Sequence, residues 1–347
     1  MSIVIRQADL QRDRELLIEM LHRYLAPQLS AERFDWLYSK NPYGLARAWI
    51  AVDTSSEDVV GVASAFPRIF YVGDREELSF VFGDFCVHDQ YRSLGPALQL
   101  QRACLTVVEE ESASFCYDFP SLRMMAIYQR LGIPPSEQMV RLTKPLRVDR
   151  KVQDLLRSPV LSRGARVIGN AALALWDFHR KMREAPIDIT LHSGLCGEEF
   201  SALARETRAY HGACIKRTAA YLNWRYLANP FARYEMITAR TGKTLLAYAI
   251  FAQEGGDGLL VDLFGREESA FLFTLVMKVS MLLRNRGASA VNVALVDSHP
   301  WLTFFQQAGF KVREGKPIVI YTPPNPRMLP SFGEKQKWLL LHGDRDS

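Results

Sequence analysis

The chain has 347 residues, enough for two ordinary domains, and its 48% hydrophobic and 23% charged residues are the profile of a soluble globular protein. No apolar run approaches the ~20 residues that a membrane-spanning helix needs, and no signal peptide precedes the first strand pattern, so we expect a cytoplasmic protein. The net charge of +5 arises in residues 147–184, with nine Lys and Arg against four Asp and Glu, and the balanced remainder argues against a nucleic-acid partner.

The first half alternates strands and helices. Hydrophobic periodicity predicts, in chain order, a strand at 3–6, helices at 10–25 and 30–38, strands at 48–52, 59–66 and 77–87, a helix from 94, a strand at 115–119, a helix at 121–131 and a strand at 139–146. Ser30 is expected to cap the second helix, and Gly132 is expected to end the helix at 121–131.

Residues 147–186 interrupt this pattern with basic residues around the apolar stretch 167–176. One or two linker helices that pack on a domain would account for it. A basic amphipathic helix resting on an anionic membrane is the alternative, and it would allow a weak membrane-surface contact through residues 147–184.

The second half repeats two signatures of the first in the same order. Trp-Leu-Tyr-Ser-Lys-Asn-Pro at 36–42 recurs as Trp-Arg-Tyr-Leu-Ala-Asn-Pro at 224–230, and Ile-Tyr-Gln-Arg-Leu-Gly-Ile at 127–133 recurs as Phe-Phe-Gln-Gln-Ala-Gly-Phe at 304–310. Two matches in matching order indicate a duplicated domain.

The element order is repeated as well. The second half predicts a strand at 187–191, helices at 196–210 and 218–227, strands at 234–239, 245–253 and 259–264, a helix at 270–286, a strand at 290–296, a helix at 300–307 and a strand at 318–321. The Pro-rich tail beyond residue 323 is expected to be loose.

The loop between the strand at 77–87 and the next helix reads Arg92-Ser93-Leu94-Gly95-Pro96-Ala97. A helix that follows a strand through small residues presents unpaired N–H groups and the positive end of its dipole, which suits a pyrophosphate. An ordinary strand–turn–helix punctuated by Gly and Pro would give the same sequence.

This loop and the element order resemble the GNAT (N-acetyltransferase) superfamily. Residues 92–97 fit its acyl-coenzyme A signature Gln/Arg-x-x-Gly-x-Gly/Ala, and Tyr128 with Gly132 fits its second mark, an aromatic residue four positions before a glycine. The implied fold class is α/β (α+β), with tandem GNAT-like domains, each a mixed, mostly antiparallel sheet flanked by helices. The implied units are an acyl-coenzyme A domain at 1–146, a basic helical linker at 147–186, a degenerate second domain at 187–325 and a C-terminal tail at 326–347.

The resemblance also implies a cofactor site for acetyl-coenzyme A or another acyl-coenzyme A. The backbone of Phe85, Cys86 and Val87 would pair with the pantetheine arm, and the amides of Arg92, Ser93, Leu94, Gly95, Pro96 and Ala97 would hold the pyrophosphate, although Pro96 lacks an N–H donor. Tyr128 would protonate the departing thiolate; a core aromatic closing the helix on the sheet is its alternative role.

The second half lacks these features. Glu267 and Glu268 stand in the matching loop, where their charge would repel phosphate, and Phe305 replaces the tyrosine. Only the first domain is therefore expected to bind acyl-coenzyme A. For the general base, Asp84 is the candidate, with Asp118, His88, Glu77 and a water relay as alternatives.

The sequence thus predicts an acyltransferase that moves an acyl group, most simply acetyl, to an amine or hydroxyl of a small metabolite or sugar. An aminoacyl-tRNA-dependent, peptidyl transferase-like enzyme and a non-catalytic acyl-coenzyme A-binding scaffold are the alternatives. The five cysteines lack a Cys-x-x-Cys pair and are expected to be reduced core residues, so no metal is expected. Both a monomer and a homodimer fit the sequence.

Overall fold

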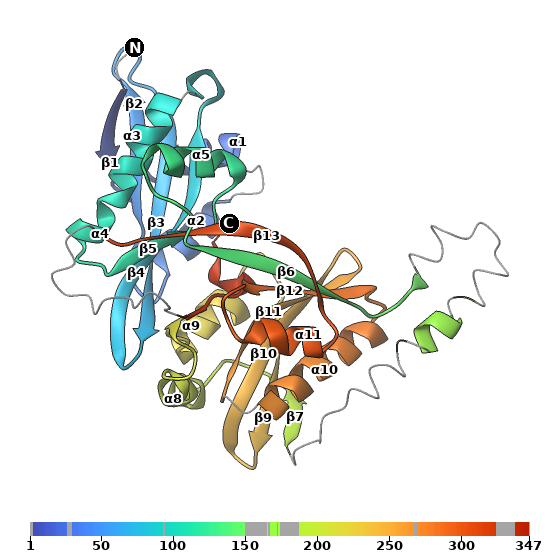
Figure 1. The fold of residues 1–347 in the computed structure, drawn as a ribbon. Coiled ribbons are helices and arrows are strands. Elements are labelled where there is room, and N and C mark those ends of the chain that lie inside the picture. The colour runs from blue at the N-terminus through green and yellow to red at the C-terminus, as the bar shows by residue number, and fades with distance from the viewer. Residues whose placement is uncertain are drawn as a thin grey trace.

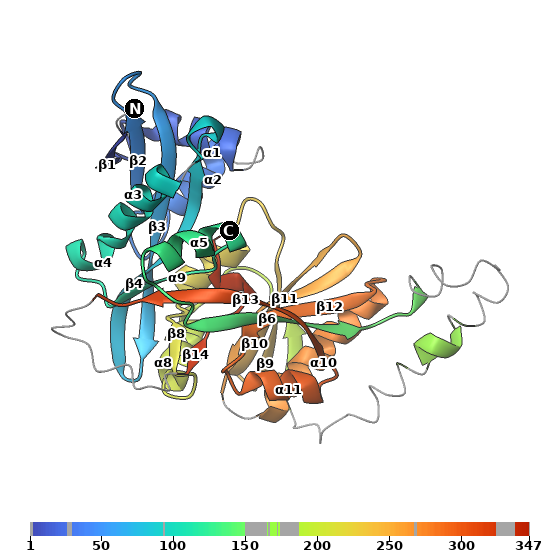
Figure 2. The same cartoon turned by 45° about the horizontal axis from the view of Figure 1, so that its top comes forward.

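A computed structural model describes residues 3–25, 30–92, 94–149, 165, 167–171, 173, 187–266, 269–323 and 337–346. These residues form two lobes, one from each half of the chain, with β6 and β13 crossing between them (Figures 1 and 2).

The elements of the first half follow the predicted order. They are β1 (Ile3–Gln7), α1 (Arg14–Tyr24), α2 (Ala31–Phe34), the π-helix η1 (Asp35–Ser39), β2 (Arg47–Asp53), β3 (Val59–Val72), β4 (Arg75–Val87), the 3-10 helix η2 (Asp89–Tyr91), α3 (Leu94–Leu105), α4 (Val107–Glu110), β5 (Phe115–Asp118), α5 (Leu122–Arg130) and β6 (Glu137–Pro145). The predicted caps are confirmed: the Ser30 side chain accepts from the Arg33 amide, and Gly132 has a positive φ of 76° beyond α5.

The second half repeats this order, with two short strands, β8 and β14, that the periodicity did not predict. Its elements are β7 (Asp188–Leu191), α8 (Glu198–Thr207), β8 (Ala213–Ile215), α9 (Ala219–Leu222), the π-helix η3 (Asn223–Leu227), β9 (Glu235–Thr241), β10 (Thr244–Glu254), β11 (Asp257–Gly265), α10 (Ser269–Asn285), β12 (Ala290–Val296), α11 (Trp301–Gln307), β13 (Lys311–Tyr321), β14 (Trp338–Leu339) and the 3-10 helix η4 (His342–Asp344).

The strand order of the sheet is symmetric about its centre. The described strands follow the path β1-β2-β3-β4-β5-β13-β6-β12-β11-β10-β9-β7. Each side of the path therefore has five strands from one half of the chain followed by a sixth strand from the other half. The pairs β4–β5 and β11–β12 are parallel, and the other pairs along this path are antiparallel. The two halves therefore exchange their final strands. The equivalent strand order on both sides of the centre supports a duplicated domain.

The repeated Trp-x-Tyr signatures meet at the interface of the halves. Trp36 lies in η1 and Trp224 in η3, and the indole N–H of each donates to the backbone carbonyl of the other at 2.9 and 3.0 Å. Their rings stack with centroids 5.0 Å apart. Each indole N–H satisfies the buried backbone carbonyl of the other tryptophan. This reciprocal contact explains why the chain carries the same motif twice.

The apolar core reflects the same arrangement. One cluster lies between the first sheet and the face of α3 and α5. A larger cluster begins under α1 and runs without interruption into the second half. All five cysteines are buried and unpaired, as expected.

The tail is not loose where the structure describes it, and that expectation was wrong. Trp338, Leu339, Leu340 and Leu341 are buried, and β14 pairs in parallel with β8, which in turn pairs with β3. Asp344 and Asp346 are buried against arginines of both halves. The apolar run from Trp338 to Leu341 is typical of a buried segment.

The basic segment lies largely outside the described residues, so neither interpretation of residues 147–186 is tested. Among its described residues, 165, 167–171 and 173 are helical. Among the described helices, none combines the length and apolarity that crossing a bilayer requires.

Candidate active site

A gap opens where β4 and β5 separate. The two strands pair from Ser79 with Phe115 to Val81 with Tyr117, after which β5 ends at Asp118 while β4 continues to Val87. Beyond Val81, the edge of β4 that faced β5 therefore presents backbone groups to the gap. An extended ligand with amide groups can pair with such an edge as another strand would.

A bulge in β4 lies beside this gap. Asp84 and Phe85 together oppose Ala63 of β3, and Asp84 adopts a left-handed φ of 48°. The Asp84 carboxylate is buried and receives two hydrogen bonds of 2.8 Å from Arg33 and one of 3.0 Å from the Tyr38 hydroxyl. These contacts hold the strained bulge in place and occupy the carboxylate that was the candidate base.

The loop that follows β4 leads into α3. Ser93 lies outside the described residues, as does the side chain of Leu94. A Cβ built on Gly95 would meet no atom within 4 Å, so the backbone at the start of α3 is open to an approaching group. Arg92 is exposed beside it and pairs with Asp89 at 2.7 Å.

A cavity of about 1140 Å³ joins these features and reaches the second half. From the predicted cofactor site it is lined by Phe85, Cys86, Val87, Arg92 and Ala97, and Asp84 also lines it. Its far wall comes from residues that sequence reasoning missed, namely Arg225, Asn229, Phe231, Ala232, Tyr234, His342, Gly343, Arg345 and Asp346. A volume of this size holds a large ligand.

The predicted acid, Tyr128, belongs to a buried network at the wall of the cavity. Its hydroxyl donates to Asp118 at 2.7 Å and accepts from the Gln101 amide at 3.1 Å. Burial and the neighbouring Asp118 raise the pKa of Tyr128 far above its ordinary range, so it carries its proton at neutral pH. Asp118 and Gln101 line the cavity themselves.

Asp118 differs from the other candidate bases. Burial raises the pKa of its carboxyl group to about 6, against the opposing effect of the Tyr128 hydrogen bond. Glu77 lies at the start of β4 and accepts from Ser114, while His88 accepts from the Gln90 amide. Of the named alternatives, Asp118 is the residue that lines the cavity with a carboxyl group poised near neutral pH.

The remaining titratable groups of interest are structural. Burial raises the pKa of Cys86 to about 12, so its thiol is not an activated nucleophile. His211 and His299 are buried core residues, and burial lowers the pKa of His211 to about 4. The described residues contain no cluster of three or more His, Cys, Asp or Glu side chains suited to a metal ion.

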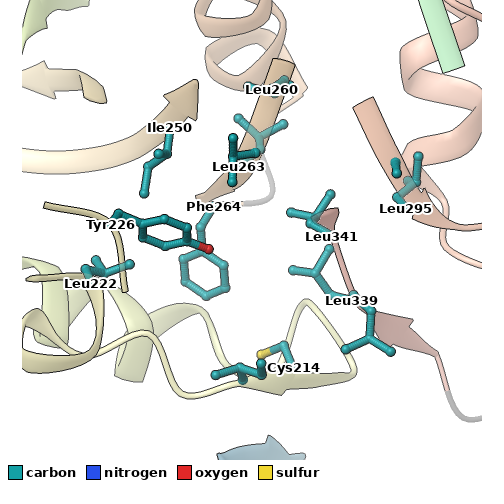
Figure 3. Close-up of a cluster of buried hydrophobic side chains, with 14 of the residues drawn as sticks. Cys214, Leu222, Tyr226, Ile250, Leu260, Leu263, Phe264, Leu295, Leu339 and Leu341 are labelled. Carbon is teal, nitrogen blue, oxygen red and sulfur yellow. The ribbon is translucent and has the colours of Figure 1, made fainter. Parts of the chain in front are cut away.

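The matching gap in the second half is filled by the chain itself. β11 and β12 pair from Gly258 to Leu260 and then separate, and the edge of β12 that β11 leaves is taken by the tail: Leu295 forms a bridge with Leu341. Figure 3 shows Leu339 and Leu341 in one cluster with Leu263, Phe264 and Leu295.

Asp262 in this half occupies the position of Asp84. It is fully buried and bound by Arg217, which also binds Asp344 of the tail at 3.0 Å. Phe305 is buried where the first half has Tyr128. Glu267 and Glu268, which were expected to repel phosphate, lie outside the described residues.

Comparison with known proteins shows the fold. Neither a family model nor a curated protein sequence matches the chain. Among solved structures, a GCN5-related N-acetyltransferase from Anabaena variabilis aligns with a TM-score of 0.65 and 13% identity over 92% of this chain and 73% of that one. One from Kribbella flavida aligns with a TM-score of 0.61 and 12% identity over 92% and 71%. Saccharomyces cerevisiae N-myristoyltransferase with bound myristoyl-CoA aligns with a TM-score of 0.56 and 12% identity over 97% and 88%.

These likenesses confirm the predicted fold class. The chain has the GNAT fold in tandem, with mixed, mostly antiparallel sheets flanked by helices. At this level of identity they carry no assignment of substrate.

Proposed function

We propose that the protein is an acyl-coenzyme A-dependent acyltransferase whose single donor site is the gap between β4 and β5. The observation that carries this proposal is the continuity of three features. The free edge of β4, the loop residues Arg92 and Ala97 on either side of Gly95, and Asp118 all line one cavity of about 1140 Å³. Tyr128 lies directly behind this wall and donates to Asp118. We expect the transferred group to be acetyl. We expect the acceptor to be an amine or hydroxyl of a small metabolite or sugar.

The described residues fit the donor's shape and charge. The edge of β4 at Phe85–Val87 suits the amides of a pantetheine arm, and the start of α3 suits the pyrophosphate because its N–H groups and dipole favour anions. Pro96 removes one donor, but it lies in the first helical turn, where its cost to the helix is small. Bound there, the donor supplies the activated thioester.

The chain's own groups would then manage protons. Tyr128 holds a proton at neutral pH and can give it to a departing thiolate. Asp118 is mostly ionised at pH 7 and can accept the proton of an attacking amine or hydroxyl. The contacts of Asp84 with Arg33 and Tyr38 favour a positioning role for it, because each oxygen already accepts a hydrogen bond. Its assignment as base stays a prediction.

Calorimetry of acetyl-coenzyme A binding tests the proposal. Wild type should bind at micromolar levels, roughly −8 kcal/mol, and Gly95→Glu should not, because a side chain and a negative charge would meet the pyrophosphate. The fold should tolerate the substitution since a Cβ at Gly95 has free space. Gln99→Glu, exposed one turn further along α3, is the matched charge control and should bind as wild type does.

Two outcomes would contradict the proposal. Unchanged binding by Gly95→Glu would place the donor elsewhere, and absence of binding by the wild type would remove the donor site altogether. Binding without turnover on a panel of amines would favour the non-catalytic scaffold instead.

A further inference from the structure

Arg345 stands on the wall of the cavity opposite the first half. It follows η4, and its side chain is half-buried and lies over the ring of Phe119, with the guanidinium carbon 5.4 Å from the ring centroid. The same residue lines a second cavity of about 320 Å³, bounded by β6, β11, β12 and β13. Arg345 is therefore accessible at the junction of two hollow regions.

The charge of Arg345 has no direct partner in the part of the chain that the structure describes. Arg33 pairs with Asp84, Arg225 with Asp346, and Arg92 with Asp89. The guanidinium of Arg345, in contrast, makes no hydrogen bond or ion pair to a described residue, and its Nε is buried without an acceptor. Burial lowers the pKa of Arg345, with Asp118 opposing this from a distance. A half-buried cation without an anion in direct contact is costly, and a ligand that supplies one gains that interaction.

The position of Arg345 separates it from the donor's phosphates. Asp118 is the last residue of β5 and Phe119 follows it, at the end of the gap where Tyr128 is held. The pyrophosphate would lie instead at the start of α3. If the sulfur of the donor thioester lies beside Tyr128, Arg345 lies on the side from which an acceptor approaches. This step rests on the proposed function above.

We propose that Arg345 binds a carboxylate of the acceptor, so that the substrate class is amines or alcohols that carry a carboxylate, such as amino acids or other carboxylated amines. A single guanidinium matches a planar carboxylate through two parallel hydrogen bonds. Phosphate sites, in comparison, gather several donors at a helix start or nest.

Bisubstrate conjugates test this without turnover. Coenzyme A is joined through its sulfur to an acetyl group amide-linked to glycine, β-alanine or 4-aminobutyrate, and each conjugate is compared with the methylamine, ethylamine or propylamine conjugate that lacks the carboxylate. Calorimetry on the full chain should show at least tenfold tighter binding for one carboxylate conjugate over its uncharged partner. Free coenzyme A is measured alongside.

Variants assign the effect to the residue. Arg345→Gln should remove the tenfold preference while leaving the affinity for free coenzyme A and the uncharged conjugates within twofold, and Arg345→Lys should retain part of it. Arg130→Gln, on the exposed face of α5, is the control and should change nothing. Thermal melts of each variant verify the fold, and the wild-type comparison of conjugates stands without any variant.

Three results would overturn the inference. These are equal affinity of all matched conjugates for the wild type, a preference that survives in Arg345→Gln, and an equal loss of free coenzyme A binding in Arg345→Gln, which would make Arg345 a donor-phosphate contact. Failure of the wild type to bind coenzyme A at all would instead refute the proposed function, and this inference with it.

Discussion

In the first half, β4 and β5 separate beyond Val81 around an open cavity, while in the second half β11 and β12 separate beyond Leu260 and the tail lies against the freed edge of β12. Both gaps follow a parallel strand pair, and both place a buried aspartate, Asp84 or Asp262, beside an arginine. The architecture is duplicated, but only one copy is left open.

The difference shows how a duplicated fold can keep one site and convert the other into structure. Apolar side chains of residues 338–341 fill the second gap, and burying them stabilises the fold. The same tail then carries Asp346 to Arg68 and Arg225, and Arg345 to the wall of the first cavity. The closed copy thus supplies part of the pocket of the open one.

The largest expected effect comes from uncoupling the tail. Burial disfavours the charges of Arg68 and Arg225, and Asp346 offsets this by raising the pKa of both. Asp346→Ala would therefore leave two buried arginines without their carboxylate. We expect a loss of about 3–5 kcal/mol in the free energy of unfolding, measured by urea denaturation. Glu314→Ala, which breaks the exposed pair with Arg141, should cost at most about 1 kcal/mol. Similar losses for both variants would contradict a structural role for the tail.

The next effect comes from giving the first half the residue of the second. Tyr128→Phe introduces the ring found at Phe305 and removes the proton donor. Acetyl-coenzyme A binding should be unchanged, and the rate of thiol release should fall by about 10²-fold or more. The reverse change, Phe305→Tyr, should add no binding site because residues of the tail occupy that gap. Tyr128→Phe activity within threefold of wild type would identify Tyr128 as a core aromatic only.

A pH profile gives a smaller but specific effect. Asp118 acts as a base only when ionised, and burial raises its pKa to about 6, so kcat should fall about tenfold per pH unit below that value. An aromatic amine acceptor, uncharged across pH 5 to 8, avoids the acceptor's own titration. Asp118→Asn should lose most of the activity together with this acidic limb. A limb that persists in Asp118→Asn would assign it to another group.

The smallest expected effect tests the symmetry of the interface. Trp36→Phe and Trp224→Phe each remove one of the two reciprocal indole hydrogen bonds and leave a buried carbonyl without its donor. Each should cost about 1–3 kcal/mol in the free energy of unfolding, and the two costs should agree to within about 1 kcal/mol. A loss confined to one tryptophan would show that the halves do not share this contact equally.

Local pattern predicted most elements, because strands and helices are encoded by neighbouring residues. The motifs at 36–42 and 224–230 revealed the duplication, and residues 92–97 revealed the strand-to-helix loop. The exchange of β6 and β13 between the halves was not predictable from the sequence. The alternation of apolar residues that predicts a strand is the same whichever strand pairs with it. The Pro-rich run near residue 324 favours a loose tail, whereas the apolar residues Trp338–Leu341 that follow it are buried. Arg225 and Arg345 line the same cavity as β4 and α5, although Arg225 follows the end of α5 by 95 residues and Arg345 follows it by 215. No local pattern encodes a contact over such a separation.

The stoichiometry of acetyl-coenzyme A binding tests the contrast between the halves most directly. Native mass spectrometry of the full chain with excess acetyl-coenzyme A should show one molecule bound per chain in the wild type and none in Gly95→Glu. Two molecules bound per chain, or one that persists in Gly95→Glu, would contradict the account of one open and one closed site.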